Sequence, residues 1–512
     1  MISSATENGQ PPLSGAMLLL AAFVIAGANF IAVLDMTIAN VSVSTISGSL
    51  GTSISQGTWI ITSYAVAEAI TVPLTGWLAS RFGAVRVFCV SMLMFALSSL
   101  ACGIAPSFEL LVSARVLQGL FGGPLMPLSQ SLLIRIFPKE NAAMASGIWG
   151  MTTLVAPVLG PIMGGYICSE FSWGWVFLIN VPIATVGGLV AFTLLRRYEQ
   201  ARQKNPIDVV GMGLLLVWVS ALQIFLDKGK DLDWFESPVI TTLAVVSVVV
   251  FGVFLIWEYY EEHPSVDIRV FRHKGFAIPT VTLFLGFASL FAANVLTPLW
   301  LQNFMGYSSF ESGKTTAWSG VLAVCLAPVV AVLSTRVDPR KLVCIGLTWI
   351  SAVSVVRSFA NTDMDYWSIA LPILALGIGM PMFFVPLMSL ALGNVDEKEV
   401  ASAAGLLSFI RTMAGAIGTS VVTTAWEDQA TQVHAYYAGI TDRDLQLTHA
   451  LQGLGLPTSA TPSTLENMLH TQSIMISTNQ LMLTIALCYL FAAWFIWLSP
   501  RSNKTIDTST VH

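Results

Sequence analysis

Charged residues, histidines and paired cysteines are scarce in this sequence. Only 10% of the 512 residues are Asp, Glu, Lys or Arg, whereas soluble domains have about 25%. The six cysteines lie singly without a CxxC spacing and the six histidines without a metal-ligand spacing, so we expect no disulfide framework, metal site or enzyme active site. The formal net charge is -5 and no basic cluster stands out, which excludes the footprint of a nucleic-acid-binding protein.

Long apolar runs are what the sequence has in abundance, with 55% hydrophobic residues and a mean hydropathy of +0.73. Runs long enough to cross the roughly 30 Å hydrocarbon core of a bilayer recur about fourteen times. The predicted spans are residues 16–35, 57–79, 87–105, 109–134, 142–167, 173–195, 208–227, 237–257, 276–300, 314–335, 342–360, 366–392, 400–425 and 475–498. The sequence therefore predicts an all-α integral membrane protein. Its N-terminus lacks the features of a signal peptide, so the first span is expected to stay as an anchor.

The lysines and arginines indicate the orientation of these spans. An even number of spans places both termini on one side of the membrane. If that side is the inside, the inner segments hold 17 of the 24 basic residues and the outer segments hold 4. Short cytoplasmic loops carry an excess of basic residues in membrane proteins. We therefore predict that both termini are cytoplasmic.

Short motifs recur at offsets of 255 to 259 residues. The matched positions are Arg81 and Arg86 with Arg336 and Lys341, Pro127 with Pro386, and Gly147 and Gly160 with Gly405 and Gly418. Internal repeats of this kind mark transporter folds. We predict an N-terminal six-helix bundle at 1–195, a connector with two inserted helices at 196–265 and a C-terminal six-helix bundle at 266–512. The last includes a long outer loop at 426–474, whose leucines between 445 and 456 suit either short docking helices or an unstructured excursion.

Five ionisable side chains fall within the predicted spans, where a charge at the centre of a helix costs about 2.5 to 3.5 kcal/mol on insertion scales. They are Asp35, Glu68, Arg115, Arg357 and Arg411. Residues of this kind are rarely exposed to lipid, so they are candidates for function. Arg357 is the exception, because it lies near the outer end of its span and its side chain is expected to reach the interface.

Asp35 and Arg115 are the candidates for proton coupling. Asp35 has apolar neighbours on both sides, and a carboxylate buried in such a run can bind and release a proton. Arginine stays charged, so Arg115 acts by holding a carboxylate, and we favour Asp35 as its partner. The alternatives are a solvated Asp35 at an outer helix end and a permanent arginine–carboxylate clamp. Proton coupling is expected mainly in the first half of the chain. The region of the second half that corresponds to Arg115, near Leu374, is apolar and has no basic residue.

Glu68 and Arg411 are each close to the middle of a span. Glu68 is either a further proton-coupling group, a recognition charge for cations, or a hydrogen-bonding partner of a neighbouring helix. Arg411 is expected to attract an anionic substrate group or to pair with a carboxylate. Aromatic, methionine and polar side chains near these charges are expected to line an adaptable substrate cavity. The predicted cavity residues are Gln118, Met126, Trp149, Met151, Phe384 and Arg411.

Glycine and proline are concentrated in the span 142–167. The residues singled out are Gly147, Pro157, Gly160, Pro161, Gly164 and Gly165. Glycine costs about 1 kcal/mol and proline about 3 kcal/mol in a helix interior, so this density needs a reason. The simple explanation is that these small residues allow membrane helices to pack closely. The pattern also resembles the antiporter motif of drug/proton exporters in the major facilitator superfamily, which implies a kinked helix between two halves of a transporter and export rather than import.

Two further segments resemble motifs of the same superfamily. Residues 115–119, Arg-Val-Leu-Gln-Gly, resemble its RxxQG motif, in which the arginine implies proton transfer or the holding of a carboxylate. Residues 76–86 resemble its loop between helices 2 and 3. Ser80 stands there in place of the usual Asp, which weakens the charge-relay role that the motif implies.

The resemblance covers nearly the whole chain and points to one group of exporters. The most specific segments are residues 59–64, 73–79, 123–133 and 173–182. Together with 226–234 and the long outer loop, they resemble the EmrB-type fourteen-helix multidrug exporters of Gram-negative inner membranes. This implies a major facilitator fold and a proton-driven antiporter that exports lipophilic compounds by alternating access, with the proton gradient in place of a cofactor.

The same resemblance implies partners. These are a periplasmic adaptor of EmrA type, a TolC-type outer-membrane channel reached through the adaptor, lipophilic small molecules and the surrounding membrane lipids. The remaining alternative is a major facilitator importer of a nutrient or siderophore. The direction of dye flux in vesicles with an imposed pH gradient distinguishes the two.

Overall fold

The computed structural model describes residues 15–52, 54–138, 142–199, 208–361, 364–395, 399–441 and 461–500, and these ranges contain helices and no strand. The first group of helices is α1 (Gly15–Ser49), α2 (Ile54–Gly57), α3 (Trp59–Phe82), α4 (Ala84–Gly103), α5 (Phe108–Gly122), α6 (Leu125–Ile136), α7 (Ala142–Glu170), α8 (Trp175–Leu178) and α9 (Asn180–Leu195). The inserted pair is α10 (Val209–Lys228) and α11 (Pro238–Tyr260). The second group is α12 (Lys274–Asn303), α13 (Ser309–Arg336), α14 (Pro339–Arg357), α15 (Tyr366–Gly393), α16 (Val400–Thr441) and α18 (Thr461–Phe495). Short 3-10 helices are η2 (Arg196–Tyr198), η3 (Lys230–Leu232), η4 (Trp234–Glu236), η5 (Ile268–Arg272) and η6 (Ile496–Leu498).

The structure is compatible with fourteen spans. Each predicted span falls on helix, and eleven helices in the described ranges are long and apolar enough to cross a membrane. The bent helix α7 makes a twelfth when its two parts count as one span. Helix α3 and the pair α5–α6 do not meet this test, and they carry the buried polar residues Glu68, Arg115 and Gln130. Two of the three predicted coupling residues, Glu68 and Arg115, therefore lie on helices that fail this test, whereas Asp35 lies on the strongly apolar α1.

Two predicted bounds are wrong for identifiable reasons. The span 109–134 is two helices, because Gly123 and Pro124 separate α5 from α6. Proline removes one hydrogen bond of the helical ladder, and the adjacent glycine weakens the helix at the same point. The first span was predicted to end at residue 35, but α1 continues to Ser49. No proline intervenes before Gly51, whose positive φ of 69° closes the turn.

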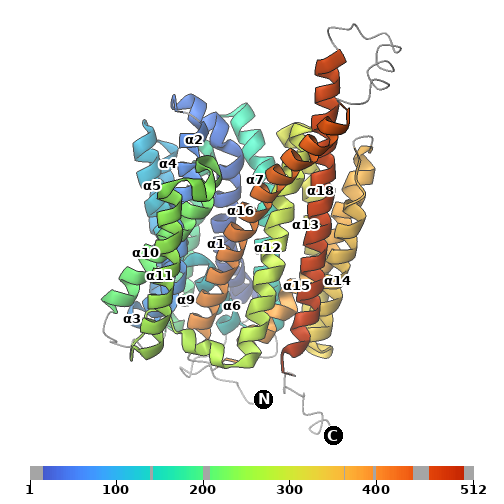
Figure 1. Ribbon diagram of the computed structural model, residues 1–512. Helices are drawn as coiled ribbons and strands as arrows, with labels where there is room; N and C mark the ends of the chain where they lie inside the picture. Colours follow the sequence, from blue (N-terminus) through green and yellow to red (C-terminus); the bar gives the residue numbers. More distant parts are fainter. Residues whose placement is uncertain are drawn as a thin grey trace.

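Much of the predicted loop 426–474 is helical instead. Helix α16 continues to Thr441 and α18 begins at Thr461, so two helices extend past the spans that hydropathy defines. The leucines between 445 and 456 lie outside the described residues. Figure 1 shows α16 and α18 projecting above the other helices. We call this the upper end of the molecule and the opposite one the lower end.

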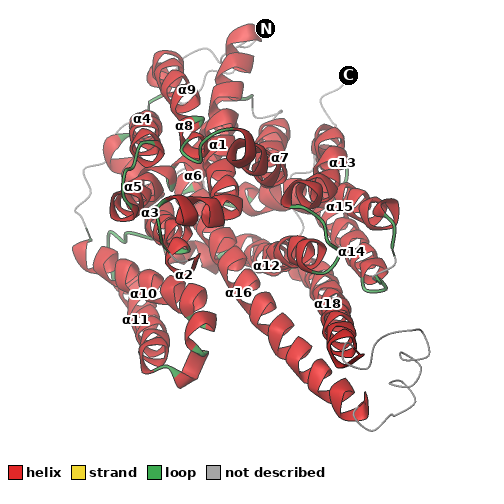
Figure 2. Ribbon diagram, turned by 90° about the horizontal axis from the view of Figure 1, so that it is seen from above, coloured by secondary structure: helices red, strands yellow, loops and turns green. Residues whose placement is uncertain are grey.

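The helices pack in two groups, with the inserted pair at one side. In the first group α1 packs on α7, α3 on α5 and α4 on α9. In the second group α12 packs on α16, and α14 contacts both α15 and α18. Seen from above, α10 and α11 lie side by side at the edge of the molecule, where α10 contacts α3 and α16 (Figure 2).

Two seams join the groups, one between α7 and α13 and one between α3 and α16. Both seams are closed at the lower end. A Cβ added to Gly147 would lie 3.0 Å from Cβ of Ala331, and one added to Gly76 would lie 2.8 Å from Cα of Ser402. Glycine at these positions allows the backbones of the two groups to touch.

Candidate proton-coupling and substrate-binding site

A hydrogen-bonded network surrounds Asp35 inside the first group. Asp35 lies on α1 and is fully buried. Nη1 of Arg115 on α5 lies 2.5 Å from its Oδ2, and the side-chain amides of Gln118 and Asn180 donate to its Oδ1 over 2.9 and 2.7 Å. The predicted pairing of Asp35 with Arg115 is confirmed. The alternative of a solvated Asp35 at a helix end is wrong.

Arg115 is held from several sides. Its Nε donates to the carbonyl oxygen of Ile60 on α3 over 2.9 Å, and its Nη1 also donates to Oε1 of Gln118 over 2.7 Å. Its guanidinium carbon lies 4.2 Å from the ring centroid of Tyr64, a cation–π contact. Arg115 therefore connects α5 to α1 and α3, so a change at Asp35 acts on three helices.

Gln118 was predicted to line the substrate cavity, but the structure places it in this network. Besides Asp35, its amide donates to Oγ of Ser99 on α4 over 2.8 Å. Sequence reasoning missed Ser99 and Asn180. Asn180 gave a usable signal, since it is an amide within an otherwise apolar run. Ser99 gave none, because small polar residues are common where membrane helices pack.

Glu68 is a second buried carboxylate, on α3. Neither carboxylate oxygen has a hydrogen-bond partner among the described residues, which contradicts the predicted alternative of a hydrogen bond to a neighbouring helix. The guanidinium groups of Arg411 and Arg115 act on it electrostatically from the two groups of helices. A buried carboxylate without a hydrogen bond is costly, so Glu68 is available to a proton or a ligand.

Arg411 reaches from α16 toward the first group. Its Nη2 lies 2.6 Å from Sδ of Met126 on α6. Its guanidinium carbon lies 5.5 Å from the ring centroid of Trp149 and 5.9 Å from that of Phe287. Trp149 in turn stacks on Phe384, with centroids 5.7 Å apart and planes inclined by 21°. Four predicted cavity residues, namely Met126, Trp149, Phe384 and Arg411, therefore meet at the boundary between the groups.

Polar contacts fix Trp149 in place. Its indole N–H donates to Oγ of Ser129 on α6 over 2.9 Å. Close to it, the amide of Asn29 on α1 donates to the hydroxyls of Thr152 and Thr153 over 2.8 and 2.7 Å. These bonds hold α7 against α1 and α6, and the sequence did not point to them.

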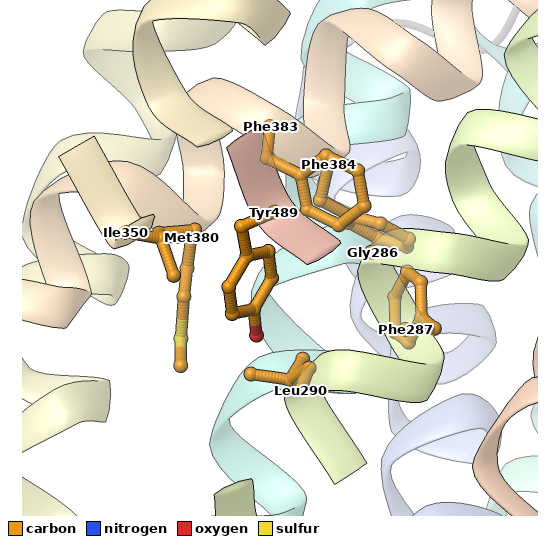
Figure 3. Close-up of a pocket in the computed structure, with 8 residues that line it drawn as sticks. All are labelled: Gly286, Phe287, Leu290, Ile350, Met380, Phe383, Phe384 and Tyr489. Carbon is orange, nitrogen blue, oxygen red and sulfur yellow. The ribbon is translucent and has the colours of Figure 1, made fainter. Parts of the chain in front are cut away.

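An apolar pocket adjoins this cluster in the second group (Figure 3). Its lining residues are Gly286, Phe287, Leu290, Ile350, Met380, Phe383, Phe384 and Tyr489. Figure 3 shows the Tyr489 ring between Met380 and Phe287, with its hydroxyl pointing toward Leu290. Because Phe384 belongs to both sites, the pocket continues the surface formed with Trp149. Met151 is half-buried on α7 and does not line this pocket.

Three glycines of the predicted antiporter motif, including Gly147 at the α13 seam, are close-packing positions and a fourth is not. A Cβ at Gly160 would overlap Thr37 on α1, and one at Gly164 would lie 3.1 Å from the carbonyl oxygen of Ile38. Gly165 has no atom within 4 Å of such a Cβ, so packing does not require glycine there. The close-packing interpretation therefore explains part of the motif.

The kink predicted for this span is present. Pro157 and Pro161 lie inside α7, which bends by 41° between Pro157 and Leu159. The helix contacts α1 on one side and α13 on the other, and Gly147 faces the α13 seam. Its predicted place between the two groups is confirmed, and a role in export remains a prediction.

A carboxylate from another segment of the chain lies at the loop where Ser80 replaces the usual Asp. It belongs to Glu199, just after η2, and it accepts hydrogen bonds from the backbone N–H groups of Val85 and Arg86 over 3.1 and 3.0 Å. Glu199 thereby caps the start of α4. The hydroxyl of Ser80 donates to the carbonyl oxygen of Trp77 in its own helix.

Arg357 was expected to reach the membrane interface, but its side chain turns inward. Its Nη2 donates to Oγ1 of Thr297 on α12. The side chain lines a pocket between α12, α14, α15 and α18. The position of Arg357 near a helix end did not predict the direction of its side chain. The sequence does not show how a helix is rotated about its axis.

The fold and this site are those of a membrane transporter: apolar helices in two groups, with buried ionisable side chains and an aromatic surface where the groups meet. Residues 25–419 match the family model described as Major Facilitator Superfamily. The chain belongs to this family.

Comparison with individual relatives shows which group of this superfamily the chain resembles. The chain is 38% identical over 495 residues to the multidrug export protein EmrB of Escherichia coli K12, which covers 96% of this chain and 97% of that protein. It is 38% identical over 493 residues to the fatty acid resistance protein FarB of Neisseria gonorrhoeae, with the same coverage of 96% and 97%. The predicted resemblance to EmrB-type multidrug transporters is confirmed. A crystal structure of the human organic anion transporter MFSD10 shares the fold, with a TM-score of 0.58, 15% identity and coverage of 95% of this chain and 100% of that one.

Proposed function

We propose that this protein is a proton-driven exporter of lipophilic toxic compounds in the bacterial inner membrane. The observation that carries the proposal is the fully buried ion pair between Asp35 and Arg115. Burying two charges is expensive, and removing the charge of one partner leaves the other uncompensated. The pair is therefore a switch that a single proton can operate. Relatives named for multidrug export support the direction and the class of compound.

Protonation of Asp35 changes the network in a defined way. The ionised carboxylate accepts hydrogen bonds from Arg115, Gln118 and Asn180. A proton on either oxygen sets an O–H against one of these donors and removes the charge that balances Arg115. The network then has to rearrange, which favours a different packing of α1, α5 and α9. We propose that a proton from the upper, periplasmic side drives this step and leaves to the cytoplasm as the compound moves outward.

The compound binds at the boundary between the two groups in this proposal. Trp149, Met126 and Phe384 offer an adaptable apolar surface there. Glu68 and Arg411 bring opposite charges from opposite groups. One binding site at this boundary can therefore accept lipophilic cations, anions and neutral compounds, which suits a multidrug exporter.

We further propose that the upper end docks a periplasmic adaptor of EmrA type, which connects to a TolC-type outer-membrane channel. The support is the extension of α16 and α18 beyond the spans, where Tyr436 is 66% exposed. His434 and Glu466 join the two extensions over 3.1 Å. Co-expression tests this: the Tyr436→Ala variant should retain less adaptor than the wild type on purification, and equal retention would contradict this docking surface.

Transport in inverted membrane vesicles tests the export proposal. With an imposed pH gradient, the wild type should accumulate a lipophilic fluorescent dye in the lumen. The Asp35→Asn variant keeps the size of the side chain but cannot titrate, so gradient-driven accumulation should fall to background. Glu236→Gln, which removes an exposed carboxylate at η4, is the matched control and should transport normally. Full dye accumulation by the Asp35→Asn variant would contradict the assignment of Asp35 as the proton-coupling residue.

A further inference from the structure

A second pocket lies at the upper end of the second group, apart from the Asp35 network and the Trp149 cluster. It is bounded by α12, α14, α15 and α18. Its lining includes Thr297, Trp300 and Arg357 among mostly apolar side chains. Arg357 is the last residue of α14, so the pocket lies at the level where the spans end.

Arg357 brings a positive charge into this pocket without a carboxylate to balance it. Its Nη2 donates to Oγ1 of Thr297, a neutral acceptor, and no acidic side chain of the described residues pairs with it. Thr297 donates its own hydroxyl hydrogen to the carbonyl oxygen of Ala293 over 2.6 Å. Arg357 is half-buried, and among the described residues its guanidinium has a neutral hydroxyl beside it and no anion to offset the hydration that it loses.

A second donor points to the same kind of ligand. Trp300 is only 5% exposed, and its indole N–H has no partner in the part of the chain that the structure describes. Guanidinium and indole groups donate hydrogen bonds and cannot accept them. The hydroxyl of Thr478, also in the lining, already accepts from the Trp426 indole over 2.9 Å. One donor without a partner and one guanidinium without a carboxylate in the same cavity favour an anionic acceptor.

The remaining lining suits an alkyl chain. Val356, Ile369 and Met482 contribute aliphatic surface. Val356 is 57% exposed and Ser368 is also exposed, so the pocket opens at the outer surface of the helix bundle between α14 and α15. Ser368 already donates to Asp365, so polar recognition in the pocket falls to Arg357 and Trp300. The pocket therefore combines an apolar lining with two hydrogen-bond donors.

We propose that this pocket binds a monoanionic amphiphile, with its carboxylate or phosphate on Arg357 and Trp300 and its alkyl chain between α14 and α15. Two sources share this chemistry: a free long-chain carboxylate and an anionic phospholipid of the surrounding membrane. The site goes beyond the proposed export function, because it is separate from the coupling network and its occupation needs no proton gradient.

Binding of oleate to the purified full-length protein in neutral detergent tests the free-carboxylate source. Arg357→Gln should weaken binding about tenfold or more, the equivalent of one charge-assisted hydrogen bond. Arg357→Lys keeps the charge and should retain most of the affinity. Lys341→Gln removes an exposed cation from the same helix and should bind as the wild type does. Should Arg357→Gln not fold, Trp300→Phe removes only the indole N–H and should still weaken binding several-fold.

Mass spectrometry of co-purified lipid tests the other source. If a membrane lipid occupies the pocket, the wild type and Lys341→Gln should retain phosphatidylglycerol that Arg357→Gln loses, and oleate should displace it. The proposal is overturned if neither oleate nor phosphatidylglycerol distinguishes Arg357→Gln and Trp300→Phe from the wild type. Failure of the export proposal would show in the Asp35→Asn vesicle assay and would leave these binding results unchanged.

Discussion

The two groups of helices share their close packing but differ in what they bury. Gly160 packs against α1 in the first group, and its repeat partner Gly418 packs against Ala288 on α12 in the second. At the same offset of 258 residues, Asp35 corresponds to Ala293 and the Arg115 region to apolar residues such as Leu374. The interior of the second group is instead aromatic around Phe383 and Phe384. Close helix packing is therefore common to both groups. Among the described residues, the ion pair with both side chains fully buried lies in the first group, whereas the Asp338–Arg340 pair of the second is partly exposed.

The largest effect should come from breaking the ion pair on one side. Arg115→Leu leaves Asp35 buried without its cation and should lower the free energy of unfolding by about 3 to 5 kcal/mol. Arg357→Leu in the second group removes a cation that has no carboxylate partner, so it should cost no more than about 1.5 kcal/mol, the value of a hydrogen bond. Denaturant-induced unfolding of the detergent-solubilised variants measures both changes in the free energy of unfolding. The comparison between the groups fails if Arg115→Leu is no less stable than Arg357→Leu.

The shared packing predicts equal damage in both groups. Leucine at Gly160 would overlap Thr37, and leucine at Gly418 would overlap the backbone of Ala288. Overpacking of this kind typically costs about 1 to 3 kcal/mol, so the unfolding midpoints of the two variants should drop by similar amounts. Gly165→Leu is the control, because nothing lies within 4 Å of a Cβ there. A loss of stability at Gly165 as large as at Gly160 would argue against close packing as the reason for these glycines.

Glu68 tests whether the first group contains one coupling carboxylate or two. Because Glu68 lacks a hydrogen bond, Glu68→Gln removes no structural partner and should leave the unfolding midpoint unchanged or raised. Export of a lipophilic cation should fall several-fold while that of a neutral compound persists. Vesicle assays with both compounds measure this. Loss of both activities to the level of Asp35→Asn would instead make Glu68 a second coupling group.

The smallest effect is expected at the boundary between the groups. Trp149→Phe keeps a ring against Phe384 but loses the hydrogen bond to Ser129, which is worth about 0.5 to 1.5 kcal/mol. The melting temperature should fall slightly, and gradient-driven transport should continue. Abolished transport would show that the indole N–H serves the substrate rather than the packing.

Most of the fold could be predicted because the membrane imposes a simple requirement. Apolar runs of sufficient length and the distribution of basic residues locate the spans. Hydropathy cannot reveal a helix that leaves the membrane, so the extensions of α16 to Thr441 and of α18 from Thr461 were predicted as a loop. The sequence shows Gly123 and Pro124 but does not show that a helix ends there. Proline is tolerated inside several other spans, including α3 and α15.

The site was predictable where a residue needs a partner. A charge inside an apolar span has to be compensated, which led from Asp35 to Arg115. Neutral groups such as Asn180 carry no such requirement, so their place in the network emerged only from the structure. Gln118 was assigned to the cavity and Arg357 to the interface because spacing along a helix does not tell which neighbour a side chain faces.

Proton release on substrate binding tests the central claim most directly. A compound that the wild type exports is added to purified protein in weakly buffered detergent solution, and a pH indicator reports the protons released. The wild type should release protons on binding, whereas Asp35→Asn should bind the compound and release none. Undiminished proton release by Asp35→Asn would contradict the account, because another group would then carry the exchanged proton.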